Sequence, residues 1–302
     1  MPLLNTQFFR FTAVLYSTTV ARQCQRSFGG RKVTSRKGLA YCLSFFLGVL
    51  GISGCSNTSL KSAAEQELEL HYHTIKTDRF TLSAVAKAQK QNTMRIYLGG
   101  DGKPWRKNEP NTNPSGHNKL AFQLFKIDPK ATLYLSRPCY DIEPIPSDCK
   151  PKLWTSDRYS NRVIMALTEA IMKVASNSNI ELVGYSGGGT LAVLLAQQLP
   201  QVTKVLTLSA NLDQAAWTDF HNTPALSGSE NPAVNGERIT GKELHLFGHN
   251  DLEVPAAINQ RYFDNNPAAN IGVIDNFDHR CCWLEQWPEI LNSWETGLDL
   301  KP

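Results

Sequence analysis

One stretch near the middle of the chain restricts the possible folds more than any other. The apolar run 180–183 leads directly into Gly-Tyr-Ser-Gly-Gly at 184–188, and an apolar pattern with helical periodicity follows at 190–199. A serine on so short a turn between a strand and a helix has a strained backbone. Glycines on both sides remove the Cβ atoms that would collide where the strand and the helix pass close together. This arrangement predicts that the hydroxyl of Ser186 is exposed at the end of a buried strand.

The rest of the chain alternates between short apolar runs and amphipathic segments. The runs at 70–75 and 80–85 predict an antiparallel hairpin, and the later runs are typical of parallel strands buried on both faces. Strands and helices in alternation predict one α/β domain with a mostly parallel sheet. The later strands are expected at 94–98, 131–135, 180–183, 202–208, 244–247 and 271–274, and the helices at 118–126, 162–175, 190–199 and 284–291.

A long interruption at 211–240 separates two of the expected strands. Such an insertion in a compact domain is usually a lid or a binding loop, and a plain surface loop is the alternative. Because the insertion contains Trp217 and Phe220, we expect it to cover part of a pocket.

The glycines around Ser186 also allow a second interpretation, a loop that holds phosphate at a helix N-terminus. A Walker A loop needs Gly-Lys before its Ser or Thr, whereas Gly189 directly precedes Thr190. A dinucleotide fingerprint needs a second glycine two residues after Gly184, where Ser186 stands. These mismatches disfavour a nucleotide site.

The strand, the Gly-x-Ser-x-Gly turn and the helix together resemble the nucleophile elbow of the α/β-hydrolases. The resemblance covers about 71–291 and implies the α/β-hydrolase fold, with a mostly parallel central sheet, flanking helices and the insertion before the acid-bearing strand. It makes Ser186 the nucleophile and implies no metal or organic cofactor. Further motifs resemble a poorly characterised bacterial branch of this superfamily: Leu98-Gly99-Gly100-Asp101-Gly102, Arg137-Pro138-Cys139, Trp154-Thr155, Arg158-Tyr159, and Asn211-Leu212-Asp213 with Trp217-Thr218.

The resemblance also implies the chain order nucleophile, acid, histidine. The acid is expected in the turn after the strand at 244–247, where Asp251 stands and Glu253 is the nearby alternative. The base is expected after the last strand, and His279 is the only histidine after His249. Asp251 would hold the imidazole in one tautomer and stabilise its charged form.

An oxyanion that forms during acyl transfer needs two backbone N–H groups. In this superfamily one comes from the residue after the nucleophile, here Gly187, and one from the loop after the third strand, here most plausibly Gly100. Asp101 places a carboxylate next to that loop. Its side chain either points outward or binds a substrate amine, and its presence leaves the identity of the second donor open.

The positive charge of the chain lies in its first residues. The formal net charge is +4, yet residues 1–54 carry seven of the 31 Lys and Arg and none of the 27 Asp and Glu. The remaining residues are slightly acidic, so no electrostatic case for nucleic-acid binding remains. With 41% hydrophobic residues the chain can bury a sizeable core, which excludes a disordered protein.

The first residues have the layout of an exported leader. A basic cluster ends at Lys37, and the largely apolar run 38–51 is short for the ~20 residues of a membrane span. The run ends in Ile-Ser-Gly-Cys at 52–55, which resembles the lipobox of bacterial lipoproteins. We therefore expect a lipid on Cys55; an uncleaved anchor helix and an ordinary signal peptide are the alternatives.

This interpretation divides the chain into a leader at 1–54, a polar tether at 55–67 and the hydrolase domain at 68–302. The basic region of a signal is normally brief, so we suspect that the true start lies downstream of Met1. The protein is expected in the bacterial cell envelope, lipid-anchored and facing the periplasm. Ser56 is not acidic, which favours the outer membrane.

Four cysteines remain outside the leader and the lipobox, and in an oxidising periplasm they permit three pairings. Cys139 and Cys149 flank a proline-rich loop that can bring them together, so a disulfide between them is the first expectation. Cys281 and Cys282 are adjacent, and because a vicinal disulfide is strained their pairing stays open. The spacing lacks the Cys-x-x-Cys pattern that zinc prefers, which disfavours a metal site.

The leading functional interpretation is a serine hydrolase that cleaves carboxylic esters through an acyl-enzyme. Its substrate would be a small ester or a lipid-like molecule, met at a membrane to which the lipid holds the protein. Two alternatives stay open: a peptidase or amidase of the same fold, and a non-catalytic hydrolase-like lipoprotein of the envelope.

Overall fold

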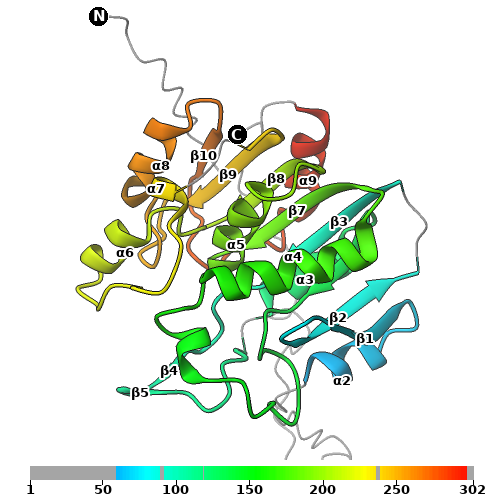
Figure 1. Ribbon diagram of the computed structural model, residues 1–302. Coiled ribbons are helices and arrows are strands. Elements are labelled where there is room, and N and C mark those ends of the chain that lie inside the picture. Colours follow the sequence, from blue (N-terminus) through cyan, green and yellow to red (C-terminus); the bar gives the residue numbers. More distant parts are fainter. Residues whose placement is uncertain (1–58, 89–91, 118, 236–238, 298–302) are drawn as a thin grey trace, which may run out of the picture. The chain divides into compact units, whose positions relative to one another are not determined.

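The computed structural model describes residues 59–88, 92–117, 119–235 and 239–297. An eight-stranded sheet has the strand order β1-β2-β6-β3-β7-β8-β9-β10, and a separate two-stranded hairpin is formed by β4 and β5 (Figure 1). The strand pairs β1–β2 and β2–β6 are antiparallel, and the other pairs of the large sheet are parallel. The strands are β1 (Leu70–Lys76), β2 (Thr81–Lys87), β3 (Thr93–Leu98), β4 (Trp105–Arg106), β5 (Glu109–Pro110), β6 (Ala131–Leu135), β7 (Asn179–Tyr185), β8 (Val202–Leu208), β9 (Lys242–Gly248) and β10 (Asn270–Ile274).

Helices cover both faces of the large sheet. One hydrophobic cluster joins the sheet to α4 and α5, and a second joins it to α2, α3 and α9. Successive side chains of β3 point to opposite faces of the sheet, so Ile96 and Leu98 belong to the first cluster and Tyr97 to the second. The helices are α2 (Leu60–Glu65), α3 (Leu120–Ile127), α4 (Asn161–Ala175), α5 (Gly187–Ala196), α6 (Gln214–Phe220), α7 (Pro232–Asn235), α8 (Gln260–Asn265) and α9 (Trp287–Thr296), with 3-10 turns at Pro151–Trp154 and Ala256–Asn259.

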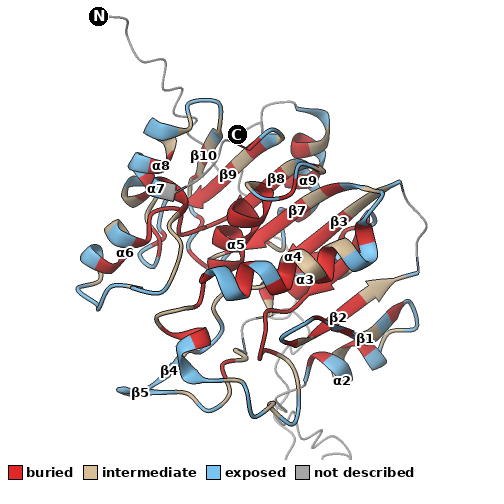
Figure 2. Cartoon of the chain, in the orientation of Figure 1, coloured by how far each residue is buried: buried red, intermediate tan, exposed pale blue. Residues whose placement is uncertain are grey.

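Because helices cover the sheet on both faces, its central strands appear in the sequence as continuous apolar runs. Burial is concentrated in the central strands and in α5, all of whose residues are buried (Figure 2). The strand β6 is buried at every position, as expected for a strand covered on both faces. The predicted fold class, hairpin and six later strands are confirmed, and so are the four helices, although the last one occupies Trp287–Thr296 where 284–291 was expected.

The start of the folded domain differs from the prediction. The polar segment at 55–67 was expected to be a tether, yet Leu60–Glu65 forms helix α2, and Leu60 and Ala64 are completely buried in the second cluster. The hydroxyl of Ser59 caps this helix by accepting the N–H of Ser62 at 3.1 Å. The predicted leader at 1–54 and Cys55 lie outside the described residues.

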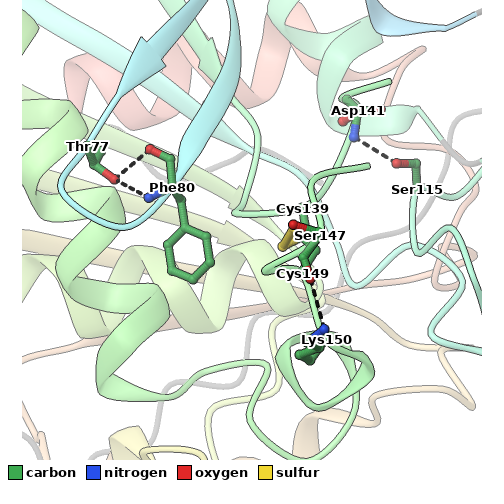
Figure 3. The surroundings of a disulfide bond; sticks show 8 residues. All are labelled: Thr77, Phe80, Ser115, Cys139, Asp141, Ser147, Cys149 and Lys150. Atoms are coloured by element: carbon green, nitrogen blue, oxygen red, sulfur yellow. Dashed lines mark hydrogen bonds between the residues drawn. A yellow bond between two sulfur atoms is a disulfide. The ribbon is translucent and has the colours of Figure 1, made fainter. Parts of the chain in front are cut away.

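The four cysteines of the described residues form two disulfides. Cys139 and Cys149, which the sequence pairs, are joined with their Cα atoms 5.7 Å apart. Figure 3 shows this bridge, with Lys150 donating to the carbonyl of Ser147 in the same loop. Closing a loop with a sequence separation of 10 stabilises a fold by about 3 kcal/mol. Cys281 and Cys282, whose pairing the sequence left open, are joined to each other.

An ion-pair network at Arg95 on β3 lies inside the domain. The guanidinium contacts carboxylates of Asp128 at 3.0 Å, Glu181 at 2.8 Å and Glu295 at 2.9 Å. Burial disfavours the charge of Arg95, but the carboxylates of Asp128 and Glu181 outweigh it and raise the pKa of the guanidinium. Removing one partner from a buried network of this kind typically costs about 3–5 kcal/mol.

Within the described ranges, none of the helices combines the length and the apolar character that crossing a membrane requires.

Candidate active site

The candidate site lies where the carboxyl ends of the parallel strands meet. Strands β3 and β7 are neighbours, with Leu98 opposite Gly184, although they are far apart in the sequence. The chain leaves β3 toward β6 on one side and leaves β7 toward β8 on the other, so a crevice forms between their ends. Ser186 follows β7 and Gly100 follows β3, which brings both residues to this crevice.

Ser186 has the strained backbone that the sequence predicts. Its φ is 53° and its ψ is −127°, and α5 begins at the next residue. The turn is tight because a Cβ atom on Gly184 would lie 2.4 Å from the carbonyl oxygen of Gly188. The N–H of Ser186 donates to the carbonyl of Leu208 on β8 at 2.8 Å, which fixes the turn to the sheet.

Asp251, His279 and Ser186 form a connected row. Nδ1 of His279 lies 2.9 Å from Oδ2 of Asp251, and Nε2 lies 3.1 Å from Oγ of Ser186. A carboxylate can only accept a hydrogen bond, so Nδ1 carries the proton and Nε2 can accept the proton of the serine. The structure thus brings together the three residues to which the sequence assigns the nucleophile, the acid and the base.

The local turn holds Asp251 in its ionised form. Its Oδ1 accepts the N–H of Glu253 at 2.9 Å and that of Val254 at 2.8 Å. Burial alone would raise the pKa of Asp251, but the hydrogen bond and the charge of His279, together with the N–H of Val254, lower it below its usual range. An ionised Asp251 can stabilise a positive charge on His279.

Glu253, the alternative acid, has a different position. Its carboxylate is half exposed and lies 3.7 Å from Nε2 of His279, on the side that faces Ser186. It also forms an ion pair with Arg280 at 2.8 Å. An acid that orients the imidazole must contact Nδ1 of His279. Asp251 does so, whereas Glu253 lies near Nε2.

The two expected oxyanion donors lie on either side of Ser186. A Cβ atom on Gly100 would be 3.3 Å from Cβ of Ser186, so this loop backbone lies against the nucleophile. Gly187 is the first residue of α5, where N–H groups have no partner inside the helix. Both glycines line the pocket that contains Ser186.

The side chain of Asp101 neither points outward nor is free to bind an amine. Its carboxylate forms ion pairs with Arg137 and Arg158, both at 2.8 Å, and accepts the hydroxyl of Tyr159 at 2.7 Å. Burial would raise the pKa of Asp101, but the charges of Arg137 and Arg158 and the hydrogen bonds from Tyr159 and Arg158 lower it to about 2. Arg137, Arg158 and Tyr159 occur in the sequence within motifs to which no role could be assigned.

A pocket of about 950 Å³ opens at Ser186. The insertion forms one wall, where Trp217 lines the pocket and donates its Nε1–H to the carbonyl of Glu253 at 3.0 Å. Phe220, also expected to cover the pocket, is instead 53% exposed and does not line it. The small hairpin of β4 and β5, which the sequence did not indicate, contributes Trp105 and Lys107 to another wall.

Helix α6 of the insertion is fixed by polar contacts from later in the chain. Asp213 caps the helix by accepting the N–H of Ala216 at 3.3 Å, and its carboxylate is bound by Arg261. Asn259 accepts the N–H of Leu212 at 2.7 Å. These contacts hold the pocket wall in place.

The part of the chain that the structure describes contains no group of three or more His, Cys, Asp or Glu residues arranged to hold a metal ion.

Neither a family model nor a curated protein sequence matches the chain. Solved structures do match it. A membrane phospholipase A, described as a bacterial virulence factor, is 12% identical, with 87% of this chain and 97% of that chain covered and a TM-score of 0.57. A putative lipase from Acinetobacter baumannii AYE is 15% identical, with 78% and 97% covered and a TM-score of 0.52. The alpha/beta hydrolase domain-containing protein 10 from mouse is 14% identical, with 76% and 98% covered and a TM-score of 0.53. At these identities the likeness concerns the fold, and it shows that the chain has the α/β-hydrolase fold.

Proposed function

We propose that the protein is a serine hydrolase that cleaves carboxylic esters through an acyl-enzyme on Ser186. The observation that carries this proposal is the row of hydrogen bonds from Asp251 through His279 to Ser186, at 2.9 Å and 3.1 Å, with His279 and Ser186 lining the pocket. Nucleophile, base and orienting acid within hydrogen-bond reach are the arrangement that acyl transfer by serine requires.

The reaction would proceed in two halves. Nε2 of His279 takes the proton of Ser186 as Oγ attacks the substrate carbonyl, and Asp251 stabilises the imidazolium. The N–H groups of Gly100 and Gly187 bind the oxyanion that develops. His279 then gives the proton to the leaving alcohol, and a water molecule, activated by the same imidazole, releases the acid and restores Ser186.

Two observations support an ester with an apolar part. The pocket is lined by large apolar side chains, among them Trp105, Trp217 and Leu226. Two of the structurally similar proteins are described as a phospholipase A and a putative lipase. An apolar wall beside the nucleophile can bind an acyl or alkyl chain by removing its surface from water.

A panel of p-nitrophenyl esters of increasing acyl length, compared with matched p-nitroanilides, tests the bond type. We expect ester cleavage with a higher kcat/KM than anilide cleavage. A preference for the anilides would replace the esterase proposal by the amidase alternative. Absence of turnover on every substrate, without labelling of Ser186 by a fluorophosphonate, would contradict a catalytic role altogether.

We also propose that a lipid on Cys55 holds the enzyme at a membrane of the bacterial envelope, on the periplasmic side. Helix α2 begins at Leu60, so only a few residues would separate the lipid from the folded domain. A chain of that length reaches at most ~15 Å. The start of the folded domain would therefore stay close to the membrane surface.

Replacing Cys55 with serine is expected to release the protein from the membrane fraction while its esterase activity is retained, because the thioether to the lipid needs the cysteine sulfur. Mass spectrometry of the mature N-terminus gives the direct readout. An unmodified Cys55, or a leader that is still attached, would contradict the anchor.

A further inference from the structure

The carboxylate of Asp101 lies directly beside the proposed oxyanion site, where an isolated negative charge would oppose the reaction. Three side chains bind it. Nη1 of Arg137 lies 2.8 Å from Oδ1, Nη1 of Arg158 donates to Oδ2 at 2.8 Å, and the hydroxyl of Tyr159 donates to Oδ2 at 2.7 Å. This set of four residues, here called the Asp101 cluster, comes from three separate parts of the sequence.

The carboxylate joins the two backbone segments that would form the oxyanion site. Asp101 follows Gly100 in the loop after β3. On the other side, a Cβ atom on Gly187 would lie 1.9 Å from Oδ1 of Asp101 and 2.5 Å from the hydroxyl of Tyr159. The backbone of Gly187 is therefore packed against the cluster, and only glycine fits there. The hydroxyl of Tyr140 also donates to the carbonyl of Asp101 at 3.0 Å, so the loop is held by its backbone as well.

The charges of the cluster are favourable for an oxyanion. Two guanidinium groups face one carboxylate, so the cluster carries a net positive charge. The charges of Arg137 and Arg158 hold the pKa of Asp101 at about 2, so near neutral pH the carboxylate is ionised and its charge is compensated. The cluster thus holds the loop without opposing the negative charge on the substrate.

Both arginines are buried among neighbouring groups. Arg137 is 3% exposed and lies between the rings of Tyr140 and Tyr159, with its guanidinium carbon 5.4 Å and 5.6 Å from their centroids. Arg158 is 5% exposed, and its Nε donates to the carbonyl of Thr155 at 2.8 Å. The Cys139–Cys149 disulfide closes the segment that runs between the two arginines.

We propose that Asp101 is a positioning residue for the oxyanion site: bound by Arg137, Arg158 and Tyr159, it fixes the Gly100 loop against Gly187 so that both N–H groups meet the developing oxyanion. This inference rests on the proposed hydrolysis at Ser186. It also assigns a function to the arginine motifs, because without them the partly buried carboxylate would be an unpaired negative charge beside the oxyanion.

The test is Asp101→Asn, with kcat expressed per competent site after titration of the enzyme with a fluorophosphonate to completion. We expect kcat per titrated site to fall about 10²-fold, the usual cost of losing one oxyanion donor, with KM nearly unchanged. A purely structural role would lower the titrated fraction and leave the rate per site intact. The control is Asp128→Asn, which removes a fully buried carboxylate that is also bound by an arginine, Arg95, but lies outside the pocket. It should lower the thermal midpoint and leave kcat per titrated site unchanged.

Tyr159→Phe provides a second, milder variant in case Asp101→Asn does not fold. It removes one hydrogen bond to the carboxylate without changing any charge, and we expect a several-fold loss of kcat per titrated site. A wild-type rate per site in Asp101→Asn, or in Tyr159→Phe if only that variant folds, would overturn the inference. Ser186→Ala distinguishes this failure from a failure of the proposed function: activity that persists without Ser186 contradicts the hydrolase proposal itself, whereas activity lost with Ser186 but not with Asp101 contradicts only the positioning role.

Discussion

Replacing Ser186 with alanine is expected to lower kcat/KM for ester cleavage by at least about 10⁴-fold, because the proposed acyl-enzyme forms on its hydroxyl oxygen. Oγ of Ser186 is the atom that Nε2 of His279 faces, at 3.1 Å, and the turn that presents it is fixed by the glycines on both sides. Alanine has the same Cβ as serine, so the strained turn and the packing around it stay as they are. The thermal unfolding midpoint should therefore change little.

Initial rates on the best ester of the panel, with purified wild-type and Ser186→Ala protein, give the comparison. Residual activity in the variant must be checked against traces of wild-type enzyme, which a stoichiometric fluorophosphonate removes. A Ser186→Ala protein that hydrolyses the ester at the wild-type rate would exclude Ser186 as the nucleophile.

Replacing Asp251 with asparagine is expected to lower kcat by about 10⁴-fold. Oδ2 of Asp251 accepts the proton of Nδ1 at 2.9 Å, and Oδ1 is occupied by the N–H groups of Glu253 and Val254. An asparagine that keeps its oxygen toward those N–H groups turns its NH₂ toward His279. The imidazole then carries its proton on Nε2 and can no longer accept the proton of Ser186.

Glu253→Gln is the matched control for this variant, since Glu253 is the other carboxylate near the imidazole. Its side chain is half exposed and stands 3.7 Å from Nε2, where it does not control the tautomer. We expect kcat within a few-fold of wild type. If Asp251→Asn were silent and Glu253→Gln were not, the acid would have to be reassigned to Glu253.

The sequence predicted the sheet well because parallel strands covered on both faces are short, continuous apolar runs. β6, buried at each of its residues, is the clearest example. The same pattern of apolar runs made it possible to predict the positions of the site residues from the sequence. Ser186 follows one such run, and Asp251 and His279 follow two others, so the ends of the strands place all three residues at one edge of the sheet.

The features that the sequence did not predict depend on contacts between distant parts of the chain. Helix α2 has only two buried residues, Leu60 and Ala64, too few to give a periodic pattern in a polar segment. Helix α6 is held by Arg261, from beyond the next strand. Short helices of this kind gain most of their stability from tertiary contacts rather than from local propensity.

The role of Asp101 could not be read from its own segment. From the sequence, this carboxylate was expected to point outward or to bind a substrate amine, because the partners that neutralise it, Arg137 and Arg158, come much later in the chain. The motifs that contain Arg137 and Arg158 could be recognised in the sequence. A linear pattern does not show, however, that both arginines contact the same carboxylate.

The central claim is that Ser186 is a nucleophile activated by His279, and labelling with a fluorophosphonate followed by peptide mass spectrometry tests it most directly. We predict a single adduct on Ser186 in the wild-type protein, no adduct in Ser186→Ala, and labelling of His279→Ala slowed by orders of magnitude although Ser186 is present. An adduct on another residue, or labelling of Ser186→Ala at the wild-type rate, would contradict it.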